Sequence, residues 1–511
     1  MSDLSPTRRQ VLIAGTAALG VAAVSGWGTA SASPVRDPFT LGVASGDPLP
    51  DGVVLWTRLA PDPLAPDGLG GMPSKVVPVE WQIAADERFQ HVVRAGAEIA
   101  RPESAHTVHA EVSGLRPGAE YFYRFRVGRE LSPAGRTKTA PRPGARLDRF
   151  SFAFASCQNR PEGFYNAYAH LAGEDLDLVA FLGDYIYEGA AQGTIGRGHV
   201  PAAETFTLAD YRLRLANYKT DPDLRAAHAA FPWALVFDDH EVENNWAGDH
   251  SQPDTEPDQD PAVFRERRAR AFQAYYEHMP LRRAQRPSGP DIRLYRRLTF
   301  GDLADLHLLD TRQYRDVQVT GDARLDPSRT ILGAEQKRWR LRGLAGPTAR
   351  WNILARQVFF AQRDFTAGAT GSFSDDAWDA YYVERNEVRD HLAGASNPVV
   401  ITGDVHAAYV ADIKADFENP ASATVASELV GTSISSGGNG VDQNAGDAVQ
   451  LAENPHIRFI NRKRGYVRNV ITRDEWTAVY RGVDYVDRPG APVVDKGTFV
   501  IENGKPGARL A

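Results

Sequence analysis

The sequence predicts a small all-β domain followed by a larger α/β domain, and three observations support this division. Residues 38–140 read as short runs of alternating or clustered apolar residues separated by turn signals. Residues 137–146 contain prolines, a glycine and scattered basic residues, which is typical of a linker. From residue 148 onward, strand-like apolar runs alternate with helical patterns. We therefore expect a β-domain over residues 38–140 and an α/β domain over residues 148–511.

The first domain is expected to fold as a β-sandwich. Its predicted strands lie at residues 53–56, 79–83, 106–112 and 121–127. The turn at residues 114–118, followed by Tyr121, Tyr123 and Phe125, looks like the penultimate hairpin of a fibronectin-type-III-like sandwich. Because no catalytic constellation occurs in this stretch, we interpret the domain as a scaffold, with carbohydrate or envelope binding as the alternative.

In the α/β domain, four predicted strands end at residues that can bind metal ions. Residues 150–155 lead to Cys157, Leu178–Leu182 to Asp184 and Tyr187, residues 234–237 to Asp239 and His240, and residues 399–402 to Asp404 and His406. Open α/β sheets bind ligands at the carboxyl ends of their strands, so four such junctions indicate one site along one sheet edge. Taken alone, Asp184 would be interpreted as a helix-capping residue at a strand end, beside two packed tyrosines. For Tyr185 we keep the interpretation as a packing residue.

The other elements are predicted from periodicity. Helical patterns occur at residues 163–172, 207–218, 262–278 and 336–344. Further strands are expected at residues 293–300, 303–309 and 351–354, and residues 476–483 are expected to pair toward residues 499–501. The third helix is expected to expose Arg265, Arg267, Arg268 and Arg270. The acidic loop at residues 243–261 is expected to be solvated, although its carboxylates could hold calcium.

The candidate ligands favour a ferric ion together with calcium. Cys157 and Tyr187 supply a thiol and a phenol, and only a strongly acidic cation lowers both pKa values enough to ionise them. Asp184 can bridge to divalent ions bound by oxygen, with Asp239, Asn244 or the amide beside it as further donors, and calcium suits such donors. Such a cluster would hold a phosphate and generate hydroxide for attack on phosphorus. Covalent catalysis through Cys157 ranks lower, because a thiolate bound to iron is a poor nucleophile.

Two further residues are candidates for acting on the substrate. His240 could protonate the leaving oxygen, and Arg312, which follows its own predicted strand, could meet a phosphate oxygen. A lone arginine such as Arg312 is more often part of a surface ion pair. His406 is expected to bind a metal or to support a residue that does. The histidines expected to be structural are His109, His170, His228 and His391.

Residues 1–32 are expected to be an export signal. Arg8 and Arg9 precede an apolar, small-residue run at residues 11–24, and Ala30-Ser31-Ala32 offers a cleavage site. The paired arginines resemble a twin-arginine signal, with the general secretion route as the alternative. The apolar run is shorter than the roughly 20 residues of a membrane span. We therefore expect no integral span in the mature chain and a secreted, periplasmic or cell-envelope location.

Composition narrows the possible partners. The chain has 511 residues and a formal net charge of −7, which argues against nucleic-acid binding through bulk positive charge. Cys157 is its single cysteine, so no internal disulfide can form. Stability must then come from the apolar core and from bound metals. We expect a monomer.

The segments at residues 156–158, 183–188, 238–245 and 403–406 together resemble the motif set of the alkaline phosphatase D (PhoD) family of calcineurin-like metallophosphoesterases. The resemblance covers nearly the whole chain. It implies a four-layer αββα catalytic domain, phosphodiesterase and phosphomonoesterase activity, one ferric ion, two calcium ions and export by the twin-arginine machinery. The positions that match the family's iron ligands are Cys157, Asp184, Tyr187 and Asp404, with Asp184 bridging to calcium.

Two departures separate the chain from purple acid phosphatases, which its Gly-Asp-and-Tyr motif also resembles. Cys157 stands where those enzymes have an Asp, and Asp404 stands where their last motif has a His. The calcium assignments of Asp239 and Asn244 have neighbouring alternatives within residues 238–245.

The sequence therefore predicts a secreted alkaline phosphodiesterase and phosphomonoesterase. A phospholipase-D-like choice of lipid diesters, or of a teichoic-acid-type polymer, stays open within that class. The alternative from a different class is a non-catalytic envelope protein whose α/β domain carries a structural metal. Such a protein would have a metal site without an open coordination position.

Overall fold

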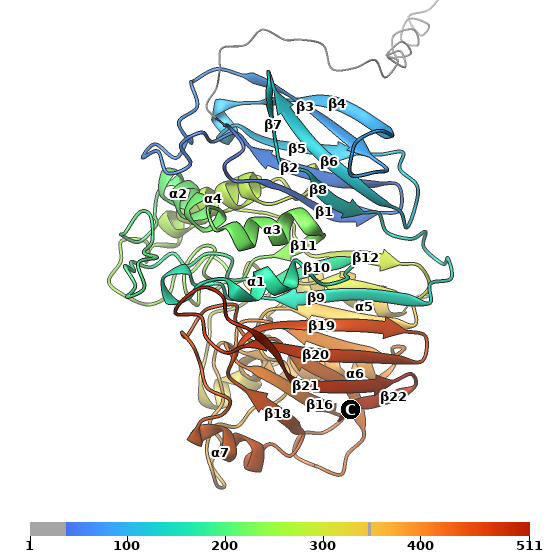
Figure 1. Cartoon of the computed structure of the whole chain (residues 1–511). Coiled ribbons are helices and arrows are strands. Elements are labelled where there is room, and N and C mark those ends of the chain that lie inside the picture. Colours follow the sequence, from blue (N-terminus) through green and yellow to red (C-terminus); the bar gives the residue numbers. More distant parts are fainter. Residues whose placement is uncertain (1–36, 346–348) are drawn as a thin grey trace, which may run out of the picture.

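The structure, a computed structural model, describes residues 37–345 and 349–511 (Figure 1). The export signal predicted over residues 1–32 lies outside the described residues. Among the residues described, no helix combines the length and the apolar character that a bilayer span requires. Three sheets organise this part of the chain.

The largest sheet has ten strands in the order β22-β21-β20-β19-β9-β10-β11-β1-β2-β5. In that order their bounds are Lys505–Leu510, Val493–Glu502, Glu475–Val483, Arg464–Thr472, Arg149–Ala155, Leu178–Leu182, Pro232–Val236, Val43–Leu49, Gly52–Arg58 and Thr107–Val112. The four central strands β9, β10, β11 and β1 are parallel. All five residues of β10 are buried, as expected of a strand covered on both faces.

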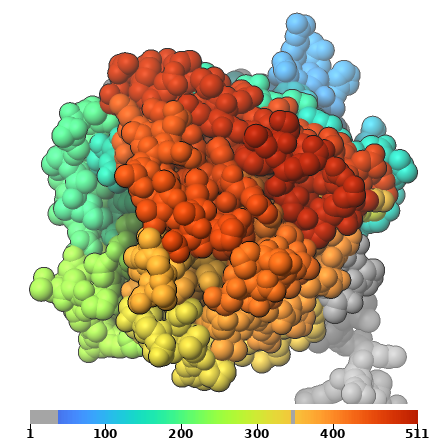
Figure 2. Space-filling view, turned by 90° about the horizontal axis from the view of Figure 1, so that it is seen from below, coloured from blue at the N-terminus to red at the C-terminus, as the bar shows by residue number. Residues whose placement is uncertain are grey.

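The second large sheet has seven strands in the order β12-β13-β14-β15-β17-β16-β18. In that order their bounds are Arg296–Phe300, Ala304–Leu308, Trp351–Arg356, Pro398–Thr402, Thr424–Val430, Ala408–Lys414 and Ile457–Asn461. The run from β13 to β17 is parallel. Segments from the C-terminal part of the chain form most of the lower face of the molecule, orange to red in Figure 2.

Helices cover the outer faces of the two large sheets, which gives the four-layer αββα arrangement. The helices are α1 (Asn166–Leu171), α2 (Leu208–Lys219), α3 (Pro222–Ala230), α4 (Pro261–His278), α5 (Gly333–Ala345), α6 (Tyr382–Ala393) and α7 (Ala445–Glu453). One core joins the sheets to each other and to α1, α3 and α4. A second core joins the outer face of the seven-stranded sheet to α6.

The N-terminal sandwich shares a sheet with the rest of the molecule. Its outer sheet consists of β4 (Val92–Ala100), β3 (Val77–Ala84), β6 (Glu120–Val127) and β7 (Glu130–Leu131), with β8 (Gly135–Lys138) also paired to β6. Its inner sheet is β1, β2 and β5, and β1 pairs with β11 in parallel. The sandwich at the top of Figure 1 is therefore hydrogen-bonded to the strands that carry the predicted site.

The bounds of most predicted helices and strands are confirmed within a few residues. The prediction of which α4 side chains are exposed is not confirmed. Arg265 and Arg270 are exposed, whereas Arg267 and Arg268 are almost fully buried. The Arg267 guanidinium meets four carboxylates, those of Glu204, Glu243, Glu256 and Asp258. The expectation of four exposed arginines was thus wrong for two of them. The acidic loop is also not wholly solvated, because Asp258 folds inward onto Arg267.

Candidate metal centre

The candidate ligands follow strands of both large sheets, whereas the sequence analysis expected a single sheet edge: β9, β10 and β11 belong to the ten-stranded sheet and β15 belongs to the seven-stranded sheet. Cys157, Asp184, Asp238 and Asp404 each stand two residues after a strand end, in β9, β10, β11 and β15. The ends of β9, β10 and β11 differ by at most one residue, since Phe181 pairs with Ala155 and Leu182 pairs with Val236. The turn after β15 reaches the turn after β9, because a Cβ at Gly403 would lie 2.9 Å from the Ser156 Cβ. The turns after these strands consequently meet in one place.

The backbone at these turns is held in an unusual conformation. Cys157, Asp184 and Asp404 have φ angles of 60°, 58° and 62°. His406 and Asn245 also lie in the left-handed region, at 56° and 55°. Non-glycine residues adopt this region at a cost, and such residues cluster at functional sites. The strain indicates that the side chains, rather than the backbone, determine these turns.

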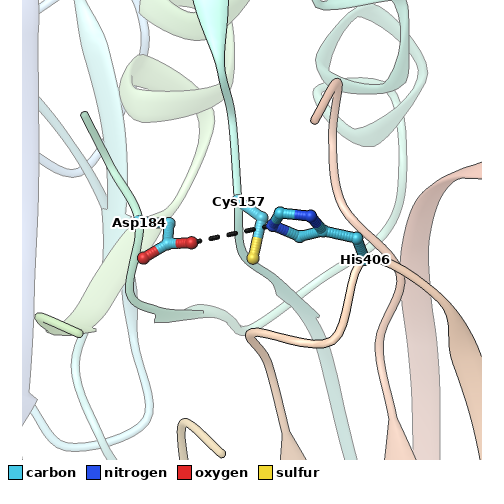
Figure 3. Close-up of side chains that lie close together, drawn as sticks. All are labelled: Cys157, Asp184 and His406. Atoms are coloured by element: carbon cyan, nitrogen blue, oxygen red, sulfur yellow. Dashed lines mark ion pairs between the residues drawn. The ribbon is translucent and has the colours of Figure 1, made fainter. Parts of the chain in front are cut away.

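Cys157, Asp184 and His406 form the first group of potential ligands, with donor atoms within 4.8 Å of one another (Figure 3). Tyr187 joins them through its Oη, which donates to Asp184 Oδ2 at 2.9 Å and lies 3.0 Å from His406 Nε2. The thiol, the carboxylate, the phenol and the imidazole therefore meet at one point, as the sequence predicted for the first three of them and allowed for His406.

Two further groups continue from the first. Asp184, Asp239 and His240 form one group, and Asp238, Asp239 and Asp404 form the next, each with donor atoms within 4.8 Å. Asp184 belongs to two groups and so lies between two potential metal positions. Asp238, which the sequence analysis passed over in favour of Asp239, is part of the cluster.

Asn244 is near the cluster but is engaged otherwise. Its backbone N–H donates to Glu188 at 2.7 Å, and its side-chain amide donates to Gln252. The neighbouring Asn245 N–H donates to Asp239 Oδ2 at 2.8 Å. The role of Asn244 as a calcium ligand stays a prediction.

The acidic groups of the cluster are buried close together, which makes their ionisation unfavourable in the absence of cations. Burial, reinforced by Asp184 and Asp404, raises the pKa of the Cys157 thiol well above its usual value. Burial likewise raises the pKa of the Tyr187 phenol, and Asp184 and Cys157 add to the effect. Burial and the neighbouring Asp239 and Asp376, against Arg312, raise the pKa of Asp404 to about 7. Each of these groups resists ionisation unless a cation stands beside it.

Asp184 behaves differently from the other carboxylates. Burial alone would raise its pKa, but the charges of His240 and His406 and hydrogen bonds from His406 and Tyr187 hold it at about 2. Its Oδ1 nevertheless accepts no hydrogen bond. The same is true of Asp238 Oδ2 and Asp239 Oδ1, all of them buried. Buried carboxylate oxygens without donors are costly, and metal coordination removes that cost.

The residues fit the two metals that the sequence predicted. A thiol, a phenol and carboxylates around one point suit a trivalent iron, which can displace the protons of both weak acids. The oxygens of Asp184, Asp238 and Asp239 suit calcium, which takes carboxylate donors in flexible geometry. Three overlapping groups leave room for more than one ion.

Arg312 is paired with carboxylates in and beside the cluster. Its guanidinium is fully buried and donates through Nε to Asp238 and through both terminal nitrogens to Asp376 at 2.7 Å. It also lies 3.6 Å from Asp239. Because Arg312 is fully buried, it is not part of a surface ion pair, whereas its contact with a phosphate oxygen stays a prediction. Arg312 fixes and partly neutralises the carboxylates.

His240 is held beside the cluster by Glu188. The His240 Nδ1 lies 2.7 Å from Glu188 Oε2, and its ring stacks at 4.1 Å on the ring of Tyr187. Burial disfavours the charged imidazole, but Glu188, Asp239 and Asp184 outweigh it and raise the pKa of His240 well above its usual value. With Nδ1 engaged, Nε2 is the nitrogen available for a substrate.

Sequence reasoning missed four residues of the site: Glu188, Asp376, Ser436 and Arg464. Glu188 ends the run that begins with Gly183, so its position offered a signal. Asp376, Ser436 and Arg464 come from segments without a distinctive motif, and only the fold brings them here. Asp376 holds Arg312 and Arg315, while Arg464 holds the backbone carbonyl of His406 at 2.8 Å.

The residues expected to be structural are so. The rings of His109, His170 and His391 contact backbone carbonyls, and His228 contacts the Tyr185 hydroxyl at 2.8 Å. Tyr185 is fully buried and packs edge-on against Phe181. These contacts leave the five residues outside the cluster.

Comparison with known proteins places this site in a family. The sequence profile described as "PhoD-like phosphatase" matches residues 152–480, and the profile described as "PhoD-like phosphatase, N-terminal domain" matches residues 25–141. The chain is 50% identical over 485 residues to "Alkaline phosphatase D" of Bacillus subtilis (strain 168), covering 92% of this chain and 82% of that protein. A solved structure titled "Structure of PhoD" aligns with a TM-score of 0.90 and 48% identity, over 94% of this chain and 93% of that one.

Proposed function

Because the chain belongs to the PhoD-like phosphatase family and is a phosphoric ester hydrolase, we propose that it hydrolyses phosphodiesters and phosphomonoesters at alkaline pH, using one Fe³⁺ and two Ca²⁺ ions held by the cluster at the strand ends. The family membership removes the non-catalytic envelope protein from consideration. A choice of lipid diesters or of a polymer stays open within the proposal.

One observation carries the proposed metal composition. Cys157 and Tyr187, two weak acids that burial keeps neutral, lie with Asp184 around one point. In a metal-free role, such a group would bury uncharged polar atoms beside unsatisfied carboxylate oxygens. A trivalent cation bound at that point would instead pair with the thiolate, the phenolate and the Asp184 carboxylate.

The chain's own residues would bind and orient the substrate around that centre. Bound there, the cations would polarise the phosphate oxygens and lower the pKa of a water molecule for attack on phosphorus. His240, anchored through Nδ1 on Glu188, presents Nε2 and can deliver its proton to the leaving oxygen. Arg312 keeps Asp238 and Asp376 in fixed positions, so that the carboxylates stay oriented while charge moves at the centre.

The test is hydrolysis of bis(4-nitrophenyl) phosphate by the purified protein. We expect nitrophenol release that a chelator abolishes and that added Ca²⁺ and Fe³⁺ restore, together with visible absorption by the ferric phenolate. Asp184→Asn should abolish release while the circular dichroism spectrum is unchanged. A colourless, iron-free protein without chelator-sensitive release would sink the proposal.

We also propose that residues 1–32 direct export by the twin-arginine machinery and that the mature protein works as a monomer outside the cytoplasm. Arg8 and Arg9 support the first part. Replacing both with lysine should leave uncleaved precursor inside the cell, as judged by immunoblotting of cell fractions. Export unaffected by the double replacement would favour the general secretion route.

A further inference from the structure

The segment after β17 forms one wall of the proposed metal centre. Its residue Ser433 pairs with Ser156, and the Ile434 N–H donates to the Ser156 carbonyl at 3.0 Å. The backbone N–H groups of Ser435 and Ser436 point at the Cys157 carbonyl, at 3.4 Å each. This segment is thus fastened along the turn that carries Cys157.

Arg464 fixes the segment from the other side. Its Nη1 donates to Ser433 Oγ and to the Ser436 carbonyl, both at 2.6 Å, and to the His406 carbonyl at 2.8 Å. Arg464 is 4% exposed, so little solvent competes for these bonds. The Ser436 side chain is therefore held by backbone contacts on both flanks.

Ser436 directs its hydroxyl at the Tyr187 phenol. Ser436 Oγ lies 2.7 Å from Tyr187 Oη and 2.9 Å from the Cys157 carbonyl, and it accepts the Asn159 N–H at 3.2 Å. A serine has one proton, so it can donate to only one of the two oxygens. The side chain is 1% exposed, and solvent cannot readily replace the bond.

The contacts of Tyr187 decide which oxygen receives that proton. The phenol can donate its own proton to Asp184 Oδ2 at 2.9 Å or to His406 Nε2 at 3.0 Å, which leaves a lone pair toward Ser436. Once the phenol has lost its proton, its oxygen can only accept. A hydrogen bond to an ionised oxygen is stronger than one to a neutral carbonyl, so the Ser436 hydroxyl then turns to Tyr187.

We propose that Ser436 is a positioning residue of the metal centre, whose hydroxyl donates to the Tyr187 oxygen and thereby sets the ring's orientation and the electron density that the phenolate gives to a metal ion. This inference rests on the proposed function, in which Tyr187 binds ferric iron. The hydroxyl withdraws electron density from the phenolate, so removing it raises the energy of the donor orbital.

The test compares visible spectra of the iron-loaded protein and three variants. Ser436→Ala should move the absorption band to longer wavelength, because the phenolate loses a charge-assisted hydrogen bond that lowers the energy of its donor orbital. Ser436→Thr keeps a hydroxyl and should retain the wild-type band. Ser435→Ala is the matched control, because its equally buried hydroxyl donates to the Asn159 carbonyl at 2.8 Å and not to the phenol.

A coloured wild-type protein whose band is the same after Ser436→Ala would overturn the inference and leave the proposed function intact. An iron-loaded wild-type protein without a band would overturn both this inference and the assignment of Tyr187 to ferric iron, and nitrophenol release would then decide separately whether the protein is a metal-dependent hydrolase. If Ser436→Ala does not fold, resonance Raman spectra of the wild type in H₂O and D₂O supply the answer. The phenolate C–O stretch should shift on exchange, and an unshifted stretch would contradict the hydrogen bond.

Discussion

Several residues of the metal centre combine a strained backbone with a buried ionisable side chain that requires a charged or hydrogen-bonding partner. Cys157, Asp184 and Asp404 occupy left-handed backbone conformations, and burial and then neighbouring charges shift the pKa of each side chain. Strain of this kind persists only where surrounding contacts hold it. Bound cations would supply part of that hold, which couples metal binding to the local fold.

Replacing Tyr187 with phenylalanine tests the assignment of the phenol. The ring is nearly buried and stacks on His240, so Tyr187→Phe keeps the packing and loses only Oη. We expect the visible absorption to disappear while the far-ultraviolet circular dichroism is unchanged. A variant that kept its colour would show that another residue binds the iron.

Replacing Arg312 with methionine tests its structural role. Asp238 and Asp376 would lose the buried cation that pairs with them, and breaking such a pair costs about 3–5 kcal/mol in the free energy of unfolding. Urea denaturation measures the loss. The control is Arg270→Ala, which removes an exposed ion pair with Glu266 and should cost less than about 0.5 kcal/mol. Equal effects of the two changes would contradict the role given to Arg312.

The sequence revealed the ligands that directly follow strands but not the residues that support them. Cys157, Asp184 and Asp404 could be found because a buried apolar run ends immediately before each. Ser436 and Arg464 could not, since their importance depends on which segments the fold brings together. The buried position of Arg312 was also beyond prediction, because its partner Asp376 is 64 residues away along the chain.

At the scale of elements, the ends of neighbouring strands must approach closely to assemble the site. Gly183 follows β10 with a φ angle of 104°, and a Cβ there would lie 2.4 Å from the Asp238 Cβ. The turn after β10 therefore requires glycine. Any larger residue would push the ends of β10 and β11 apart, and Asp184 and Asp238 with them.

Gly183→Ala should for this reason destabilise the protein by at least about 2 kcal/mol and lower its metal content. Thermal unfolding and elemental analysis measure the two effects. Gly189→Ala serves as the control, because a Cβ at Gly189 meets nothing within 4 Å, and a change within about 0.5 kcal/mol is expected. A Gly183→Ala protein with normal stability and metal content would refute the close approach.

The sequence predicted an element well where the spacing of apolar residues shows which face is buried. It predicted less well the surroundings of an element that buries charged side chains. The bounds predicted for β10 agree with the structure because an uninterrupted apolar run marks a strand covered on both faces. For α4, arginine was read as a sign of exposure. Arg267 is buried because the acidic loop that leads into α4 folds back and supplies carboxylates to it, and because Glu204 comes from a distant segment. The helical pattern of α4 does not indicate either contact.

At the scale of the whole molecule, the N-terminal sandwich is an extension of the catalytic sheet. The sequence indicated a β-domain, a linker and an α/β domain, and the two domains have the expected types of element, while β8 includes the first two residues of the predicted linker. Pairing of β1 with β11 joins them across more than 180 residues. Local sequence patterns could not predict this pairing, because the sequence of a strand does not determine which other strand it pairs with.

Metal binding should stabilise the whole molecule more as the pH rises. In the metal-free protein, burial raises the pKa of Asp404 to about 7, above its value of about 3.9 in the unfolded chain. Between these two values the folded state holds a proton that the unfolded state has lost, so the stability of the metal-free protein falls as the pH rises from about 4 to about 7 and reaches its low level above about 7. Bound cations offset this loss of stability. Above about pH 7 they also bind without displacing a proton from Asp404, so they stabilise the folded protein more.

The expected result is a larger increase in Tm on adding Fe³⁺ and Ca²⁺ at pH 8 than at pH 6, measured against the chelated protein at each pH. Asp404→Asn cannot ionise at this position, so the pH dependence of the increase should be weaker in that variant. An increase that is greater at pH 6 would contradict the electrostatic account of the cluster.

The most direct test of the metal centre is anomalous scattering from a crystal at the iron absorption edge. The account predicts an iron peak within bonding distance of Cys157 Sγ, Asp184 and Tyr187 Oη, with calcium density on the side of Asp239. An absent iron peak, or a peak that does not contact Cys157 and Tyr187, would contradict it.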